Sequence, residues 1–216
     1  MLRKYISLVM GCVSFLVISI PVGAEDGFVP IFDGKTLTNW DGNPDFWSIK
    51  DGAITGTTTK EKPTEGNTFI IWRGGTPADF ELRLQFRISG GNSGIQYRSR
   101  EVNKWVISGY QADFDGAGAW TGTLYEEKGR GVLAKRGNRV SIDVNGKRVQ
   151  KGETTAEPDI LKAVKKEDWN EYTIIARGTH LIQIVNGKVT VDVTDGQASK
   201  AAVEGLIALQ LHAGPP

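Results

Sequence analysis

Acidic and amide side chains alternate with apolar ones in two short stretches near the middle of the chain, residues 109–115 and 123–131. Both stretches read as strands, and successive residues of a strand point to opposite faces of its sheet. Gln111 and Asp113 therefore share one face of the first strand, while Glu127 can join them from the second. Two carboxyl groups on one sheet face can act as general base and general acid toward a bound molecule. The spacing predicts a polar groove built on a sheet.

Two further stretches extend this polar face. Residues 93–98 and 206–212 also alternate apolar and polar side chains, which predicts two more strands with one wetted face. Trp105 and Trp120 lie in flanking loops, where an aromatic ring can stack on a sugar. If the four strands are neighbours, one face collects Gln96, Arg98, Gln111, Asp113, Tyr125, Glu127, Gln210 and His212.

Ordinary surface and core roles account for other conspicuous residues. A solvent-facing sheet is polar without binding anything, and we expect Glu126 and Lys128 to be solvated. No spacing of histidines or cysteines resembles a metal site, so no cofactor is predicted; a divalent metal held by Asp113 or Glu127 stays open. Four tryptophans are assigned to packing: Trp40, Trp47, Trp72 and Trp169.

The first 24 residues follow the pattern of a secretory signal peptide. Arg3 and Lys4 precede an apolar run over residues 5–20, and small residues end at Ala24. The run is shorter than the roughly 20 residues that a membrane span prefers. We therefore expect cleavage after Ala24, no membrane span in the mature chain, and export to the periplasm or the extracellular space. A lipoprotein site at Cys12 is the alternative, which the continuing apolar run disfavours.

Composition narrows the classes of partner. Cys12 is the only cysteine, so a chain cleaved after Ala24 has no disulfide and no thiol nucleophile. The full chain has 26 basic and 25 acidic residues, and removing Arg3 and Lys4 leaves 24 basic ones. A near-neutral chain gives no electrostatic case for nucleic acid or an anionic membrane. A neutral partner such as a carbohydrate fits this balance better.

Strand patterns dominate the rest of the chain. Residues 80–88 alternate strictly, and Asn-Gly pairs at 145–146 and 186–187 follow apolar runs, which is typical of tight hairpins. Residues 158–164 suit a short helix. The pattern predicts an all-β fold of two antiparallel sheets packed face to face, in one domain over residues 25–216. Further strands are expected at residues 47–54, 69–72, 94–98, 172–176, 189–193 and 205–212.

Several motifs together resemble the 3-keto-disaccharide hydrolase-like family. The similarity runs in order from about residue 28 to the end of the chain, through residues 32–40, 93–98, 109–113, 124–131, 169–172, 186–187 and 205–212. The resemblance implies a concanavalin-like jelly roll, export, and action on 3-keto-glycosides held on the concave sheet face. The family usually continues past residues 212–216 into another strand. The resemblance therefore implies either a missing last strand or an open sheet edge.

The implied chemistry assigns roles to the polar face. A ketone at C3 of a sugar acidifies the proton at C2, and the enolate formed by its removal can expel the group on C1 before water adds. Asp113 or His212 would be the base and Glu127 the acid, with hydrogen-bond donors at the enolate oxygen. The expected substrate contacts are Gln96, Arg98, Trp105, Gln111, Trp120, Tyr125, Arg130 and Gln210.

Two other functions remain open from the sequence. Jelly rolls also host carbohydrate-binding modules without catalysis, and fold alone does not separate the two. Retaining glucanases of this fold carry a Glu-x-Asp-x-x-Glu strand that holds the nucleophile and the acid. Gln111 stands at the nucleophile position of that pattern, and an amide cannot form the glycosyl-enzyme ester. The glucanase interpretation is therefore ranked below the keto-sugar one.

Overall fold

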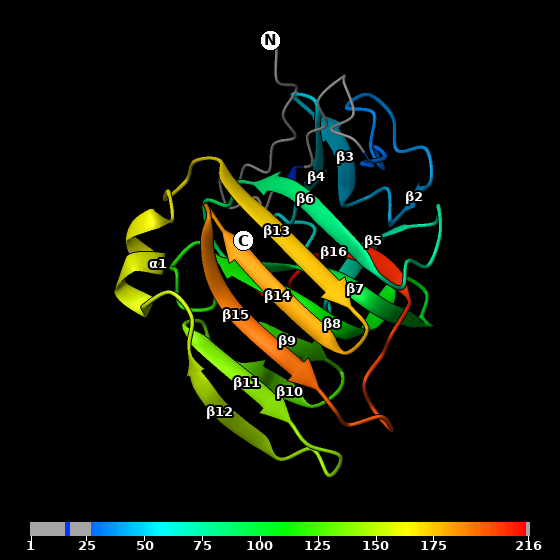
Figure 1. Ribbon diagram of the computed structural model, residues 1–216. Coiled ribbons are helices and arrows are strands. Elements are labelled where there is room, and N and C mark those ends of the chain that lie inside the picture. Colours follow the sequence, from blue (N-terminus) through cyan, green and yellow to red (C-terminus); the bar gives the residue numbers. More distant parts are fainter. Residues whose placement is uncertain (1–15, 18–26, 215–216) are drawn as a thin grey trace.

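Two seven-stranded sheets pack face to face in the computed structural model, and a small two-stranded sheet adjoins them (Figure 1). The structure describes residues 16–17 and 27–214. The predicted signal peptide over residues 1–24 lies outside these residues, apart from 16–17, and so do Pro215 and Pro216. No helix in the described part of the chain is long and apolar enough to cross a membrane.

The first sheet, here called sheet A, forms the layer nearer the viewer in Figure 1. Its neighbouring strands are antiparallel except for one parallel pair, β11 with β15, which the alternation of the sequence does not reveal. In spatial order its strands are β1 (Leu16–Val17), β6 (Phe80–Phe86), β13 (Asn170–Arg177), β14 (His180–Val185), β15 (Lys188–Asp195), β11 (Asn138–Ile142) and β12 (Arg148–Glu153).

Sheet B lies behind sheet A and contains the four strands that the sequence predicts to be neighbours (Figure 1). All its pairings between described strands are antiparallel. In spatial order its strands are β10 (Gly131–Ala134), β9 (Leu124–Glu127), β8 (Val106–Asp115), β7 (Asn92–Asn103), β16 (Leu206–Leu211), β5 (Thr68–Trp72) and β2 (Trp40–Asp41). The prediction of a jelly-roll sandwich is confirmed.

Alternate residues of both sheets fill the space between them. On β8, Tyr110, Ala112 and Phe114 are at most 1% exposed and face sheet A. The ring of Phe114 lies 4.2 Å from that of Phe86 on β6, centroid to centroid. Burying one such aromatic side chain contributes about 1.5–3 kcal/mol. Because β8 alternates, Gln111 and Asp113 point away from this core.

The turns show where the predicted boundaries hold and where they fail. Asn186 and Gly187 have φ values of 47° and 75° and close the β14–β15 hairpin in two residues, as predicted. The predicted strand over residues 47–54 is wrong, because Asp51 and Gly52, at φ 51° and 78°, divide it into the hairpin β3 (Trp47–Lys50) and β4 (Ala53–Gly56). The short helix is confirmed as α1 (Glu157–Ala163).

A bulge in β7 reshapes one end of sheet B. Tyr97 pairs with Tyr110, but the next registered pair is Arg100 with Ser108, so β7 carries an extra residue there. Arg98 adopts a left-handed φ of 45° within this bulge. Beyond it, the β7–β8 hairpin leans over the outer face of the sheet, where the carbonyl oxygen of Trp105 accepts a 3.0 Å hydrogen bond from the amide of Phe69.

Candidate functional site

A chain of side-chain hydrogen bonds crosses the outer face of sheet B and ends on Asp113. Ser99 Oγ donates to Gln96 Oε1 at 2.7 Å. Gln96 Nε2 then donates to Gln111 Oε1, and Gln111 Nε2 to Asp113 Oδ1, both at 2.5 Å. Each amide uses its oxygen on one neighbour and its nitrogen on the next, so the orientation of every group is fixed. Oδ2 of Asp113 takes no part in this chain and has no hydrogen-bond partner among the described residues.

Strand register and one glycine make this chain fit. Gln96 and Gln111 are directly paired across β7 and β8, and Gly94 is paired with Asp113. A Cβ atom at Gly94 would lie 2.5 Å from Cγ of Gln111, a distance that real side chains do not tolerate. Gly94 is therefore the position where the absence of a side chain lets Gln111 reach toward Asp113.

Gln210 on β16 presents a buried donor without a partner. Its Oε1 accepts a 3.3 Å hydrogen bond from Gln111 Nε2, which fixes the orientation of the amide. Its Nε2 has no hydrogen-bond partner among the described residues, although the residue is only 1% exposed. An unsatisfied buried polar group costs about 1–3 kcal/mol. Such a donor beside a carboxyl group suits a site that binds an oxygen-rich ligand.

Asp113 is a buried acid without a cation beside it in the described structure. Burial raises its pKa from 3.8 to about 7, against the lowering effect of the Gln111 hydrogen bond. The negative charges of Glu127 and Asp115 raise it further. A carboxyl group with a pKa near neutrality is half ionised near pH 7 and can take up or release a proton there.

Glu127 and Tyr125 complete the acidic part of this face from β9. Partial burial raises the pKa of Tyr125, and the carboxylates of Glu127 and Asp113 add to the effect. Glu127 is 9% exposed, and its Oε1 accepts a 3.3 Å hydrogen bond from Asn67 Nδ2. Asn67 also accepts a hydrogen bond from the amide of Ala213 at 2.9 Å. The sequence analysis missed Asn67, which lies in a loop with no periodic pattern.

The two tryptophans assigned to the site differ in exposure. Trp120 is 44% exposed, in a loop held by three backbone amides that donate to the carboxylate of Asp115. Trp105 is half-buried, and its Nε1 donates to Asp41 Oδ1 at 2.8 Å. It packs against a second apolar cluster on the outer face of sheet B that includes Phe69. Trp120 is therefore the more accessible of the two for stacking on a ligand, whereas the indole N–H of Trp105 is already bonded to Asp41.

The structure places Arg98 away from the polar face, because the β7 bulge turns it toward the end of the sandwich. Its side chain is fully buried, and Nη2 lies 3.1 Å from Asp79 Oδ1. Its other donors reach the carbonyl oxygens of Ala78 and Gly178. Alternation along the strand predicts the other face, since it cannot register the extra residue of a bulge.

Arg130 lies in a separate ionic cluster at the edge of the sandwich. Its guanidinium bonds Glu126 at 2.8 Å and Asp195 at 2.6 Å. Tyr110 also donates to Asp195, at 2.6 Å. The prediction that Glu126 is solvated is wrong, because this residue is 8% exposed and bonded to Arg130. We call Glu126, Arg130, Tyr110 and Asp195 the edge cluster.

His212 follows β16 and is exposed. Its ring bonds through Nδ1 to the carbonyl oxygen of the adjacent Ala213. No contact of His212 with Asp113 or Glu127 is recorded among the described residues. Of the two residues proposed as base, Asp113 alone belongs to the hydrogen-bonded chain.

A family profile covers nearly all of the described chain. The 3-keto-alpha-glucoside-1,2-lyase-like domain matches residues 27–216. The chain belongs to this family. The resemblance inferred from the sequence motifs is thereby confirmed, as is the connection to carbohydrate chemistry at the level of the family.

Individual relatives of this lyase-like domain agree with the assignment. A 3-keto-disaccharide hydrolase from Bacteroides thetaiotaomicron is 38% identical over 97 residues, which are 39% of this chain and 31% of that protein. The match therefore spans less than a third of the relative's length. A candidate glycosyl hydrolase from Parabacteroides distasonis aligns with TM-score 0.57 and 17% identity, over 90% of this chain and 93% of its own. The carbohydrate binding module CBM66 from Bacillus subtilis aligns with TM-score 0.53 and 15% identity, over 81% and 88%. These two likenesses show the fold alone.

The described part of the chain holds no cluster of side chains suited to a metal ion. Within residues 27–214, no three His, Cys, Asp or Glu side chains come together in the way that a metal site requires. The charge of Glu127 raises the pKa of Asp113, and the surrounding groups are amides and a phenol. The arrangement can therefore exchange protons with a bound molecule and donate hydrogen bonds to its oxygens.

Proposed function

We propose that this protein cleaves 3-keto-glycosides by general acid–base chemistry, with Asp113 as the base and Glu127 as the acid. The observation that carries the proposal is the buried Asp113, whose pKa is raised to about 7 while Gln111 fixes its orientation. A base of this strength removes a carbon-bound proton more readily than an ordinary carboxylate and is still partly ionised near neutral pH.

The reaction proceeds through an enolate. Asp113 takes the proton from C2, and the electrons of the broken C–H bond form a C2–C3 double bond as the ketone oxygen becomes negative. The enolate then re-forms the ketone and expels the oxygen on C1, which takes a proton from Glu127. Water then adds to the resulting C1–C2 double bond: the Glu127 carboxylate takes a proton from the water as its oxygen bonds to C1, and the protonated Asp113 returns its proton to C2.

The amides supply the hydrogen bonds that such a reaction needs. Gln210 Nε2 is a spare donor beside the Gln111–Asp113 pair, so we assign it to the ketone oxygen, where negative charge develops. Tyr125 lies directly across β8 and β9 from Gln111 and is assigned to a sugar hydroxyl. Trp120, exposed on its anchored loop, is assigned to stacking against the leaving group.

The test uses a chromogenic 3-keto-glucoside and, in parallel, its unoxidised parent. We expect the purified protein to release the chromophore from the keto compound alone, because the parent has no acidified C2 proton. Equal release from both would point to ordinary glycoside hydrolysis. Binding of the sugar without release, measured by titration calorimetry on a protein shown to be folded, would make this chain a carbohydrate-binding module instead.

We further propose that the protein is exported and loses its first 24 residues, on the strength of the signal-peptide pattern ending at Ala24. Mass spectrometry of the protein recovered from a cell envelope fraction tests this. A mature chain that begins at Glu25 is expected, whereas an intact Met1 start in the cytoplasmic fraction would contradict export.

A further inference from the structure

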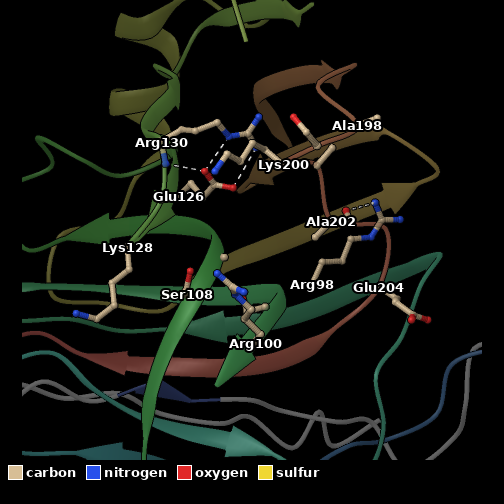
Figure 2. Close-up of a pocket in the computed structure, with 15 residues that line it drawn as sticks. Arg98, Arg100, Ser108, Glu126, Lys128, Arg130, Ala198, Lys200, Ala202 and Glu204 are labelled. Carbon is tan, nitrogen blue, oxygen red and sulfur yellow. Dashed lines mark hydrogen bonds and ion pairs between the residues drawn. The ribbon is translucent and has the colours of Figure 1, made fainter. Parts of the chain in front are cut away.

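A second pocket lies at the end of the sandwich, outside the Asp113 site (Figure 2). Its volume is about 690 Å³, within the range of pockets that hold small organic ligands. The bulge of β7, the start of β8, the β9–β10 turn and the β15–β16 connection form its walls. Neither Asp113 nor Glu127 lines it. The pocket is therefore a separate candidate for ligand binding.

The lining is strongly basic. It contains five basic residues and two acidic ones, Glu126 and Glu204. Arg130 is shared between Glu126 and Asp195, and Arg98 is held by Asp79 and by backbone carbonyls. The dashed lines in Figure 2 mark hydrogen bonds from Arg130 to the carboxylate of Glu126 and from Arg98 to the carbonyl oxygen of Ala202. These two arginines belong to the wall of the pocket.

Three other cations are free to meet a ligand. The side chains of Arg100, Lys128 and Lys200 have no hydrogen-bond or ion-pair partner among the residues that the structure describes. Figure 2 shows Arg100 and Lys128 extending without a contact to any other residue drawn. Glu204 is the one acidic residue of the lining that forms no ion pair with a described residue. The surplus of positive charge favours an anionic ligand.

The other lining groups limit the chemistry of that ligand. Serine hydroxyls are contributed by Ser99, Ser108 and Ser199, and the apolar lining residues are alanines and glycines. The lining contains no aromatic or large aliphatic side chain, so it suits a lipid chain or a nucleobase less well than a polar ligand. The volume also exceeds what a single inorganic ion needs. The combination of charge, hydroxyl groups and size fits a sugar that carries an acidic group.

We propose that this pocket binds an anionic carbohydrate, with Arg100 and Lys200 at its acidic group and Ser108 and Ser199 at its hydroxyls. β7 and β8 approach closely beneath it, because a Cβ atom at Gly109 would lie 2.3 Å from Ser99 Oγ. Ser99 also begins the hydrogen-bonded chain that ends on Asp113. The pocket and the proposed catalytic site therefore share one wall but have different ligands.

Titration calorimetry of the whole protein with three probes tests the proposal: D-glucuronate, D-glucose and inorganic phosphate. We expect glucuronate to bind at least about tenfold more tightly than glucose, and more weakly at high salt because the cations are exposed. Phosphate should bind more weakly than glucuronate. Equal affinities for glucuronate and glucose, or no binding of glucuronate at millimolar concentration, would overturn the proposal. Phosphate binding as tightly as glucuronate would overturn the carbohydrate class.

A double variant, Arg100→Gln with Lys200→Gln, tests whether glucuronate binds in this pocket. Removing two cations from around the ligand's acidic group should weaken glucuronate binding roughly tenfold, since each exposed charge pair contributes modestly to affinity. Lys188→Gln, an exposed lysine at the opposite end of β15, is the matched control and should change nothing. Unchanged affinity in the double variant would place the ligand elsewhere. Turnover of the 3-keto-glucoside is measured separately, so failure of either proposal is distinguishable from failure of the other.

Discussion

Two carboxylate clusters lie on opposite sides of β9, and they differ in what neutralises them. Glu127 faces outward toward Asp113, where amide groups and a phenol surround the two acids. Glu126, the preceding residue, turns to the edge cluster, where Arg130 bonds both Glu126 and Asp195. The strand thus sends one carboxylate to each cluster.

The pKa values of the two buried aspartates show the consequence. Burial raises the pKa of Asp113 to about 7, and no cation of the described structure opposes this rise. Burial alone would also raise the pKa of Asp195, but the hydrogen bonds from Arg130 and Tyr110 lower it below its ordinary value. A buried carboxyl group without a neighbouring cation lowers the stability of the fold, and such groups are frequent at functional sites. The edge cluster, by contrast, serves to join the two sheets.

Replacing Asp113 should have the largest effect on turnover. Asp113→Asn keeps the size of the side chain but removes the base, so cleavage of the 3-keto-glucoside should fall about 10²–10⁴-fold. The melting temperature at pH 8 should stay the same or rise, because a buried charge is removed. A variant with unchanged turnover would eliminate Asp113 as the base. A fall in both turnover and melting temperature would assign it a structural role instead.

Replacing Arg130 should have the opposite profile. Arg130→Met leaves Glu126 and Asp195 buried without a cation and should lower the free energy of unfolding by about 3–5 kcal/mol. The matched control is Arg139→Met, because the side chain of Arg139 is 54% exposed and its pair with Asp192 should contribute less than about 1 kcal/mol. Urea denaturation measures both variants. Equal small effects would show that the edge cluster does not stabilise the fold.

The sequence predicts one of these clusters better than the other. Alternation correctly places Gln96, Gln111, Asp113 and Gln210 together, because strand periodicity decides which face a side chain takes. It fails for Arg98, where a bulge adds one residue. The edge cluster depends on Asp195, 65 positions after Arg130 in the chain, and on the way the two sheets meet at their edge. The alternation of polar and apolar residues along a strand contains no information about which parts of the two sheets lie next to each other.

The two aspartates should give stability curves of opposite sign. The folded-state pKa of Asp113 is raised to about 7, so the folded state binds more protons than the unfolded state between about pH 4 and 7, and stability falls as pH rises through this range. The pKa of Asp195 is lowered, so its contribution is present above about pH 4 and is lost as pH falls below that.

Thermal melting between pH 3 and pH 9 tests this contrast. Asp113→Asn should remove the loss above pH 4, with a gain on the order of 5 °C at pH 8, and should keep the acid limb. The turnover of the wild-type protein should rise with pH around 7, as the base ionises. An Asp113→Asn curve parallel to that of the wild type would mean that Asp113 is not the group that titrates.

Removing one hydroxyl from the edge cluster should have the smallest effect. Tyr110→Phe deletes the 2.6 Å hydrogen bond to Asp195 but leaves Arg130 in place, so we expect a loss of about 1.5–3 kcal/mol, as for bonds to charged groups. Tyr97→Phe is the control, because the hydroxyl of Tyr97 accepts a 3.3 Å bond from the neutral Gln183, and its loss should lie nearer 1 kcal/mol. Turnover per folded molecule should be unchanged in both variants. Since Tyr110 and Gln111 are adjacent on β8 but point to opposite faces, a fall in turnover in Tyr110→Phe alone would show that the two clusters are coupled through this strand.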